Sequence, residues 1–173
     1  MSAFGHIAVG AAVARLTTPS GVGSWPFVGR AAVLSGLALL PDIDIVVSRF
    51  RSSEGSPIAH RAAFHSIAFA GASGFVAAAV AQSGRRRRQG MIVALVVGSH
   101  GVLDAFGQTT KGVALLWPAS SKRLLGPWHM FPSPPVNREL FSRRGLGLLG
   151  AELLVFTPLW VLAARPRHGR QAK

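Results

Sequence analysis

Apolar residues fall into five long runs that are separated by shorter polar or basic stretches. The runs cover residues 3–16, 28–47, 62–82, 90–106 and 145–164. A helix needs about 20 mostly apolar residues to cross a bilayer, and every run except the first approaches or reaches that length. The pattern predicts an all-α chain that folds as a multi-spanning transmembrane helix bundle of about four to five helices.

Prolines and charges mark where the predicted helices end. Pro41 should kink or end the second helix near Leu40, because proline lacks the N–H and clashes with the preceding turn. Residues 107–144 contain five prolines, which predicts a Pro-rich irregular connection before the last helix. We therefore expect a single helical membrane domain over residues 1–164 and a basic tail over residues 165–173.

Composition and charge support the membrane class. Charged residues make up 14% of the chain and hydrophobic residues 49%, whereas a soluble domain has roughly 25% charged residues. The net charge of +13 is typical either of nucleic-acid binding or of basic residues that meet anionic headgroups. The arginines cluster between apolar runs, as at residues 85–88, which favours membrane lipids as partners over nucleic acid. We expect a multi-pass protein of the inner (plasma) membrane.

The polar residues of the chain should gather at one end of this bundle. If the five runs alternate in direction, one end collects His6, Asp42, Asp44, His60, His65, His100 and Asp104. The other end collects the arginines of residues 85–88 and the tail, and the positive-inside rule places that end in the cytoplasm and the histidines on the outer side. The chain has no cysteine, so a metal at the histidine end would have nitrogen and oxygen ligands, which suits Zn, Mn, Fe or Mg.

The three aspartates carry the strongest chemical signal. Asp42, Asp44 and Asp104 all lie in or at the end of apolar runs, where an unpaired carboxylate costs several kcal/mol. His100 and Asp104 are four residues apart and share a helix face, so they can bind one ion or simply form a helix-pair hydrogen bond. Asp42 and Asp44 follow Pro41, and in an extended segment both would point the same way as a pair of metal ligands. The alternative is a helix end followed by a solvated turn.

Two histidines open the third run, and their neighbours are polar. His60 should lie just outside the helix and His65 in its first turns, where both could face a common ion; a packed polar helix entry is the alternative. Arg61 could hold a phosphate through its planar fork, and Ser66 could orient a ligand. His6 is either a packing residue or a further ligand. His129 and His168 have weaker claims, because one lies in the Pro-rich connection and the other in the tail.

The same positions carry a resemblance to a known family. The chain resembles the YdjM-like family of inner-membrane metal-dependent hydrolases at Gly5-His6, Leu40-Pro41-Asp42-Ile43-Asp44, His60-Arg61, His65-Ser66, His100, Asp104, and residues 107–112 and 115–118. The resemblance implies a helical membrane protein with metal-dependent hydrolase activity. Two departures are that Ala62 and Phe64 replace the usual Gly and Thr, and that Ile45 stands where the family often has His.

These observations lead to one main hypothesis and two alternatives. The main hypothesis is a membrane-bound metal-dependent hydrolase for a phosphoester or lipid-like substrate, with one or two divalent ions, Zn favoured over Mn or Mg. The expected ligands are the seven clustered histidines and aspartates, with Asp44 also taking a proton and Arg61 holding phosphate. One alternative is a non-enzymatic metal- or proton-handling membrane protein. The other is a basic membrane protein that binds anionic lipid.

Overall fold

The computed structural model describes residues 3–51, 56–108, 111–127, 130–135 and 137–165, and within these residues the extended regular elements are all helices. The α-helices are α1 (Ala3–Thr17), α2 (Ser24–Leu39), α3 (Ile43–Arg51), α4 (Ile67–Val80), α5 (Arg86–Ala105) and α6 (Arg143–Ala164). Three 3-10 turns, η1 (Leu40–Asp42), η2 (Ala63–His65) and η3 (Arg138–Phe141), join or precede them. The expected basic tail, apart from Arg165, and both His129 and His168 lie outside the described residues.

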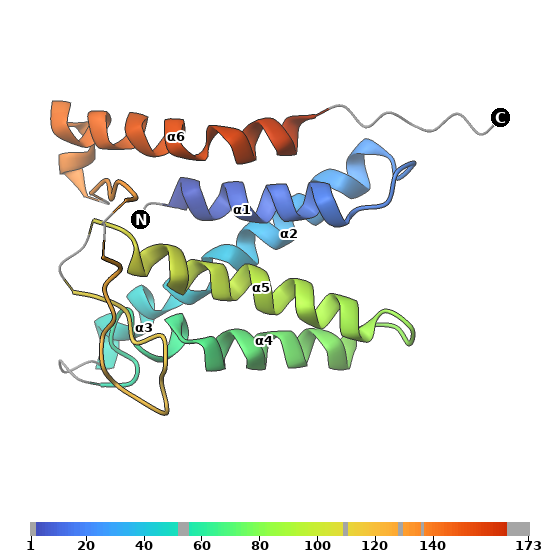
Figure 1. The fold of residues 1–173 in the computed structure, drawn as a ribbon, viewed down its shortest axis with the longest axis horizontal. Coiled ribbons are helices and arrows are strands. Elements are labelled where there is room, and N and C mark those ends of the chain that lie inside the picture. The colour runs from blue at the N-terminus through green and yellow to red at the C-terminus, as the bar shows by residue number, and fades with distance from the viewer. Residues whose placement is uncertain (1–2, 52–55, 109–110, 128–129, 136, 166–173) are drawn as a thin grey trace.

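The long helices lie side by side along one axis, and α2 crosses them obliquely (Figure 1). Helix α1 packs against α2 and α6, while α5 packs against α2 and α4. The starts of α1, α4 and α6 and the ends of α2 and α5 meet at the same end of the molecule, which also carries the irregular connection (Figure 1). We call this the loop end, and the opposite end, with residues 85–88, the arginine end.

Glycines set how closely two of the helix pairs approach. A Cβ placed on Gly10 of α1 would lie 2.5 Å from the backbone of Ser35 in α2. A Cβ on Gly74 of α4 would lie 2.6 Å from the carbonyl oxygen of Gly90 in α5. Such small-residue contacts are the usual way in which helices pack within lipid. The backbones of these helices therefore approach closely, with only small side chains such as that of Ala94 at the contact between α4 and α5.

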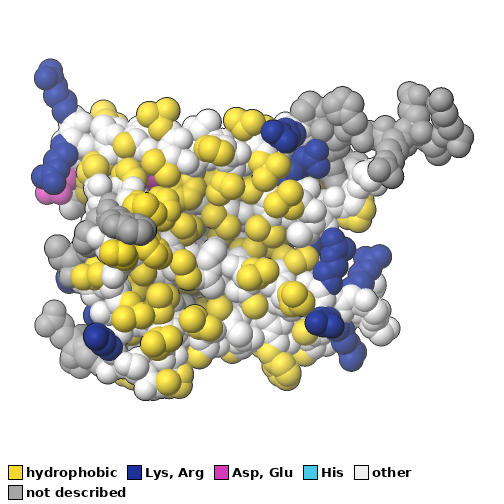
Figure 2. Space-filling view, viewed as in Figure 1, with side chains coloured by type: hydrophobic (Ala, Val, Ile, Leu, Met, Phe, Trp, Pro, Cys, Tyr) yellow, Lys and Arg dark blue, Asp and Glu magenta, His cyan; other side chains and the backbone are white. Residues whose placement is uncertain are grey.

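Two helical stretches are long and apolar enough to cross a membrane by length and composition, Ser24–Ser48 and Arg143–Ala164. The apolar helices Ala3–Thr17 and Ile67–Val80 are shorter. Many large apolar side chains are exposed, including Phe75 at 76% and Leu154 at 75%. Figure 2 shows hydrophobic side chains over the middle of the visible face and Lys and Arg side chains towards its two ends. This distribution suits a layer of lipid between two aqueous boundaries.

The predicted breaks are mostly confirmed, with two corrections. Helix α2 ends at Leu39, directly before the turn that contains Pro41, as expected. The third helix begins later than predicted, because Arg61 has a positive φ of 66° and Ser66 caps α4 by accepting from the Phe69 N–H. Of the two conformations considered for Asp42–Asp44, the structure has neither an extended segment nor a solvated turn: Asp42 lies in a 3-10 turn and the buried Asp44 in the first turn of α3.

The connection between α5 and α6 is irregular, as the prolines predicted. Its described residues form two isolated β-bridges, Gly107 with Phe131 and Val113 with Leu124. The carbonyl of Leu115 accepts from the N–H of Ile67, and the N–H of Ala114 donates to the carbonyl of Arg61. The connection is thereby fixed against the residues that precede α4, at the loop end.

Candidate metal centre

Seven side chains predicted as ligands converge at the loop end. They come from α1 (His6), η1 (Asp42), α3 (Asp44), the turn before η2 (His60), η2 (His65) and α5 (His100 and Asp104). Most of them are fully buried, whereas the side chains of Asp42 and His60 are 31% and 37% exposed. The cluster therefore has a buried interior and one accessible side.

Four atoms in this cluster face one another across a small gap. The Nε2 atom of His65 lies 3.7 Å from both Asp42 Oδ1 and Asp104 Oδ2. The Nε2 atom of His100 lies 3.4 Å from Asp42 Oδ1 and 4.0 Å from Asp104 Oδ2. Four donors around a tetrahedral zinc ion are about 3.3–3.6 Å apart. The observed spacing is therefore close to that of a zinc ligand set, slightly expanded.

The buried nitrogens in this set have no hydrogen-bond partner. Both Nε2 atoms, of His65 and of His100, are fully covered and make no hydrogen bond within the described residues. A buried polar atom without a partner is costly and rare, and an ion at that position would remove the cost. Burial also lowers the pKa of His65, so that its ring stays neutral and its lone pair can bind a metal,.

The opposite nitrogens of the rings are held in place. The Nδ1–H of His100 donates to the carbonyl of Ala38 at 2.7 Å, which leaves the Nε2 lone pair directed into the cluster,. The carboxylate of Asp44 lies 3.1 Å from His65 Nδ1 and accepts from the Nδ1–H of His60 at 2.7 Å. It also accepts from the backbone N–H of Arg61 at 3.0 Å. Asp44 thus lies against two of the clustered histidines and can orient both, while its predicted roles as a ligand and as a proton acceptor stay predictions.

His6 extends the cluster on its buried side. Its ring stacks on that of His100 with centroids 3.7 Å apart, and its Nε2 lies 3.5 Å from Asp104 Oδ1. Two triads place one ligand atom from each member within 4.8 Å of the others: His6, His100 and Asp104, and Asp42, His60 and His65. Either triad could hold a metal ion, so the cluster has room for one ion or two.

Arg61 and Ser66 have contacts that differ from those expected. The Arg61 guanidinium Nε lies 3.3 Å from Asp104 Oδ2, and its side chain is only 13% exposed. Its positive φ, unusual for a non-glycine residue, turns this side chain inward to the cluster. The Ser66 hydroxyl donates to the carbonyl of Ala63 and caps α4, so it is not available to orient a histidine.

One buried acid was missed by the sequence reasoning. Glu152 in α6 is fully buried, and its Oε1 accepts from the N–H of Gly5 in the first turn of α1 at 3.2 Å. It is the only acid within the last apolar run. The cost argument that singled out the aspartates would have identified it. Its contact joins α6 to α1 beside the cluster.

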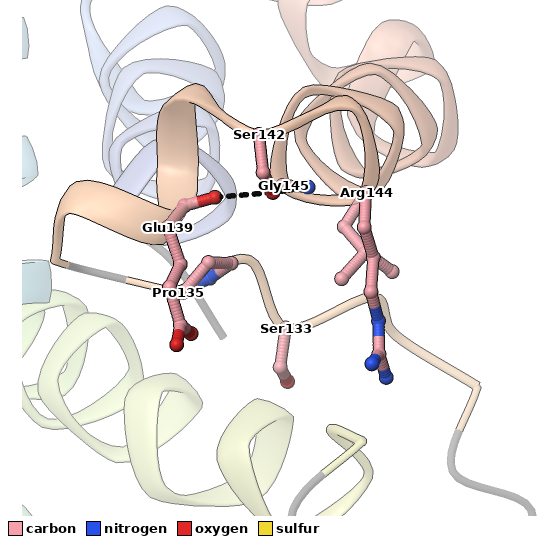
Figure 3. A pocket seen from close by; sticks show the side chains of 7 residues that line it. Ser133, Pro135, Glu139, Ser142, Arg144 and Gly145 are labelled. Carbon is pink, nitrogen blue, oxygen red and sulfur yellow. Dashed lines mark hydrogen bonds between the residues drawn. The ribbon is translucent and has the colours of Figure 1, made fainter.

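A separate pocket of about 500 Å³ opens at the start of α6. Figure 3 shows Ser133, Glu139 and Arg144 around it, with the Ser142 hydroxyl bonded to the carbonyl of Glu139. None of the seven clustered residues lines this pocket. This pocket is therefore separate from the candidate metal centre.

Comparison with known proteins gives the family. The YdjM inner membrane protein family matches residues 1–167 of the chain. The chain belongs to the YdjM inner membrane protein family. A relative in this comparison is the inner membrane protein YbcI of Escherichia coli (strain K12), 30% identical over 132 residues, which cover 72% of each chain. No solved structure matches the chain. Membership of the YdjM family confirms the predicted inner-membrane localisation and agrees with the two candidate spans.

Proposed function

We propose that this YdjM-family protein is a multi-spanning, metal-dependent hydrolase of the inner membrane that acts on a phosphoester or lipid-like substrate. The observation that carries the proposal is the pair of buried, unpartnered Nε2 atoms that face two carboxylates at 3.4–4.0 Å. Neutral imidazoles and carboxylates at this spacing suit zinc first, and manganese or magnesium next. His65, His100, Asp42 and Asp104 would hold the ion.

The residues around the ion have separate tasks in this proposal. A bound divalent ion supplies Lewis-acid polarisation and a nucleophilic water at neutral pH. Asp44 orients His60, whose partly exposed ring lies on the accessible side of the cluster and takes up the proton,. Arg61 lies beside Asp104, and its positive charge reduces the repulsion between the carboxylates of Asp42 and Asp104,. The sequence suggested that Asp44 itself takes this proton; in the present proposal His60 takes it, and Asp44 stabilises the protonated ring.

The substrate class follows from the setting of the cluster. We infer that the long apolar helices cross the bilayer together, with the arginine end in the cytoplasm and the loop end on the outer side. A site at the end of such a bundle meets the linkage region of lipids, where phosphoester and carboxylic ester bonds lie. This favours a lipid-like ester over a fully water-soluble one.

The position of the buried charges supports an enzyme over a relay. A proton- or metal-handling relay needs polar residues through the depth of the bundle. The buried charged side chains of the described residues are those of the cluster and Glu152, which contacts Gly5 beside it. The helix contact around Leu34, Ile92 and Val96 towards the arginine end is apolar. No chain of buried charges therefore leads from the cluster to that end within the described residues.

Elemental analysis of the purified full-length protein in detergent tests the metal site. We expect a fixed number of zinc ions per chain in the wild-type protein. This number is one if the ion is held by His65, His100, Asp42 and Asp104, and two if both triads are filled. His100→Ala and Asp42→Ala should lose it, and Glu139→Ala, which removes an exposed acid at the same end, should retain it. Full metal content in His100→Ala would refute the site.

Hydrolysis is then measured on the same preparations. We expect zinc-dependent release of nitrophenol from bis(p-nitrophenyl) phosphate or of fatty acid from phospholipid vesicles, lost in His100→Ala and reduced in His60→Gln. Bound zinc without any turnover of either ester would refute the enzyme and favour a metal-handling protein instead.

A further inference from the structure

An apolar groove runs over the surface of α4. A pocket of about 400 Å³ lies between α2, α4 and α5, lined by Leu37, Leu40, Val76 and Val93 among others. A second, of about 390 Å³, lies between α4 and the connection, where Phe64, Trp117 and Pro118 contribute. Both are lined by Phe69 and Ala72, so the two pockets are neighbours along α4, and we refer to them together as the groove. Nearly all of their lining side chains are apolar, which suits a hydrocarbon chain.

The groove adjoins, at Trp117, a smaller pocket that we call the polar pocket after its two serines and Arg123, although Pro57, Ala62 and Ala114 also line it. This smaller pocket, of about 260 Å³, is lined by Ser56, Ser121 and Arg123, and it shares Trp117 with the groove. The Arg123 guanidinium donates to the carbonyl of His60 through both Nη1 and Nη2, at 3.2 Å each. The polar pocket therefore lies next to the backbone of His60, whose partly exposed side chain belongs to the cluster. Trp117 stands at the boundary, the position that tryptophan commonly takes between lipid and water.

Arg123 carries a charge that no acid among the described residues compensates. Its hydrogen-bond partners are the carbonyl oxygens of His60 and Gly112, and no carboxylate in the described part of the chain lies within ion-pair distance of it. Arg61, in contrast, already pairs with Asp104. The fork of Arg123 is held in a defined orientation by the two carbonyls while its charge remains available to an anion.

We propose that this polar pocket and the α4 groove together bind one anionic phospholipid, with the phosphate at Arg123 and an acyl chain along Phe69 and Ala72. The inference rests on the proposed function, because it names the lipid that would present its ester to the cluster. It replaces Arg61 by Arg123 as the residue that recognises phosphate. Charge complementarity at one end and apolar lining at the other select an amphiphile over a free phosphate or a neutral lipid.

Quenching of Trp117 by brominated lipids measures this binding without any turnover. The protein, with Trp25, Trp128 and Trp160 changed to Phe, is placed in phosphatidylcholine nanodiscs. Part of the lipid is replaced either by dibrominated phosphatidylglycerol or by dibrominated phosphatidylcholine with the same chains. We expect the anionic lipid to quench Trp117 with an association constant about fivefold higher than that of the neutral lipid, since one arginine contributes roughly 1 kcal/mol at such a surface. If the triple variant does not fold, the quenching of Trp117 by each lipid is obtained as the difference between the wild-type chain and Trp117→Phe.

Two variants and a matched control assign the effect. Arg123→Gln should abolish the preference for the anionic lipid, and Ala72→Phe should reduce quenching by both lipids because it fills the groove. Arg87→Gln removes the same charge from the exposed arginine end and should leave the preference intact. Equal quenching by the two lipids in the wild-type protein, or a preserved preference in Arg123→Gln, would overturn the inference.

Zinc content is determined on the same nanodiscs, before and after treatment with a chelator. Lipid preference that persists in the chelated protein supports the inference by itself. A protein that binds zinc but shows no lipid preference refutes this inference alone. A protein that prefers the anionic lipid but never binds zinc refutes only the proposed function.

Discussion

The close contact between α5 and η2 predicts that Gly101→Ala disrupts the metal centre without removing a ligand. A Cβ on Gly101 would overlap the carbonyl oxygen of His65 and lie 3.0 Å from Leu115 Cδ2. The overlap with the carbonyl is about 1 Å inside ordinary contact, and metal–ligand distances tolerate about 0.2 Å. Gly101 adjoins His100 in sequence, so the two elements that must separate carry the two facing Nε2 atoms.

The expected loss is of the size seen when residues that support ligands are changed, about 10- to 100-fold in zinc affinity, or about 1.4–2.7 kcal/mol. Intrinsic helix propensity has the opposite sign, since Ala stabilises a helix interior by up to about 1 kcal/mol over Gly. Gly98→Ala, one turn earlier in α5, meets only Ala70 Cβ at 3.3 Å and is the matched control. Competition with a zinc indicator gives the zinc affinities of the purified Gly101→Ala, Gly98→Ala and wild-type proteins. Equal zinc affinity in Gly101→Ala, Gly98→Ala and the wild-type protein would show that the spacing of α5 and η2 does not set the site.

Three further predictions concern the same end of the molecule. Asp44→Asn should weaken zinc binding by about 10- to 100-fold, because Asp44 orients His60 and His65, but leave the number of zinc ions bound per protein at saturation unchanged. A titration against a zinc indicator measures the affinity and the number of ions, and an unchanged affinity would contradict the orienting role. Glu152→Ala should lower stability by about 1–3 kcal/mol through loss of the buried contact with Gly5, with zinc content retained; thermal unfolding monitored by circular dichroism checks this, and a protein as stable as the wild type would refute it. Zinc at 100 times its dissociation constant should stabilise the wild-type protein by about 2.7 kcal/mol, and a melting temperature that zinc does not raise would argue against binding to the folded state.

The gathering of the histidines and aspartates could be predicted from the sequence because it depends only on the number and direction of the apolar runs. Alternating helices necessarily place the start of α1, the end of α2, the start of α4 and the end of α5 together. The break at Pro41 could be predicted for a similar reason, because it follows from the geometry of the residue itself.

The roles within the cluster could not be predicted, because they depend on the path of residues 56–66. The positive φ of Arg61 directs its guanidinium to Asp104 and its N–H to Asp44. Nothing in the local pattern of apolar residues specifies such a conformation, and helical periodicity suggested instead that the helix begins there. Arg123 was equally hidden, since its place beside His60 results from the fold of an irregular connection.

The shortness of α4 determines how deep the candidate metal centre lies. Its 14 residues give a length of about 21 Å, against about 30 Å for the hydrocarbon core of a bilayer. If α4 crosses the bilayer with its neighbours, the membrane must thin around it by several ångströms, and His65, two residues before its start, then lies level with the glycerol backbone of the surrounding lipids. A water-soluble substrate would then have to leave bulk water to reach the candidate metal centre, whereas a lipid would only have to diffuse sideways.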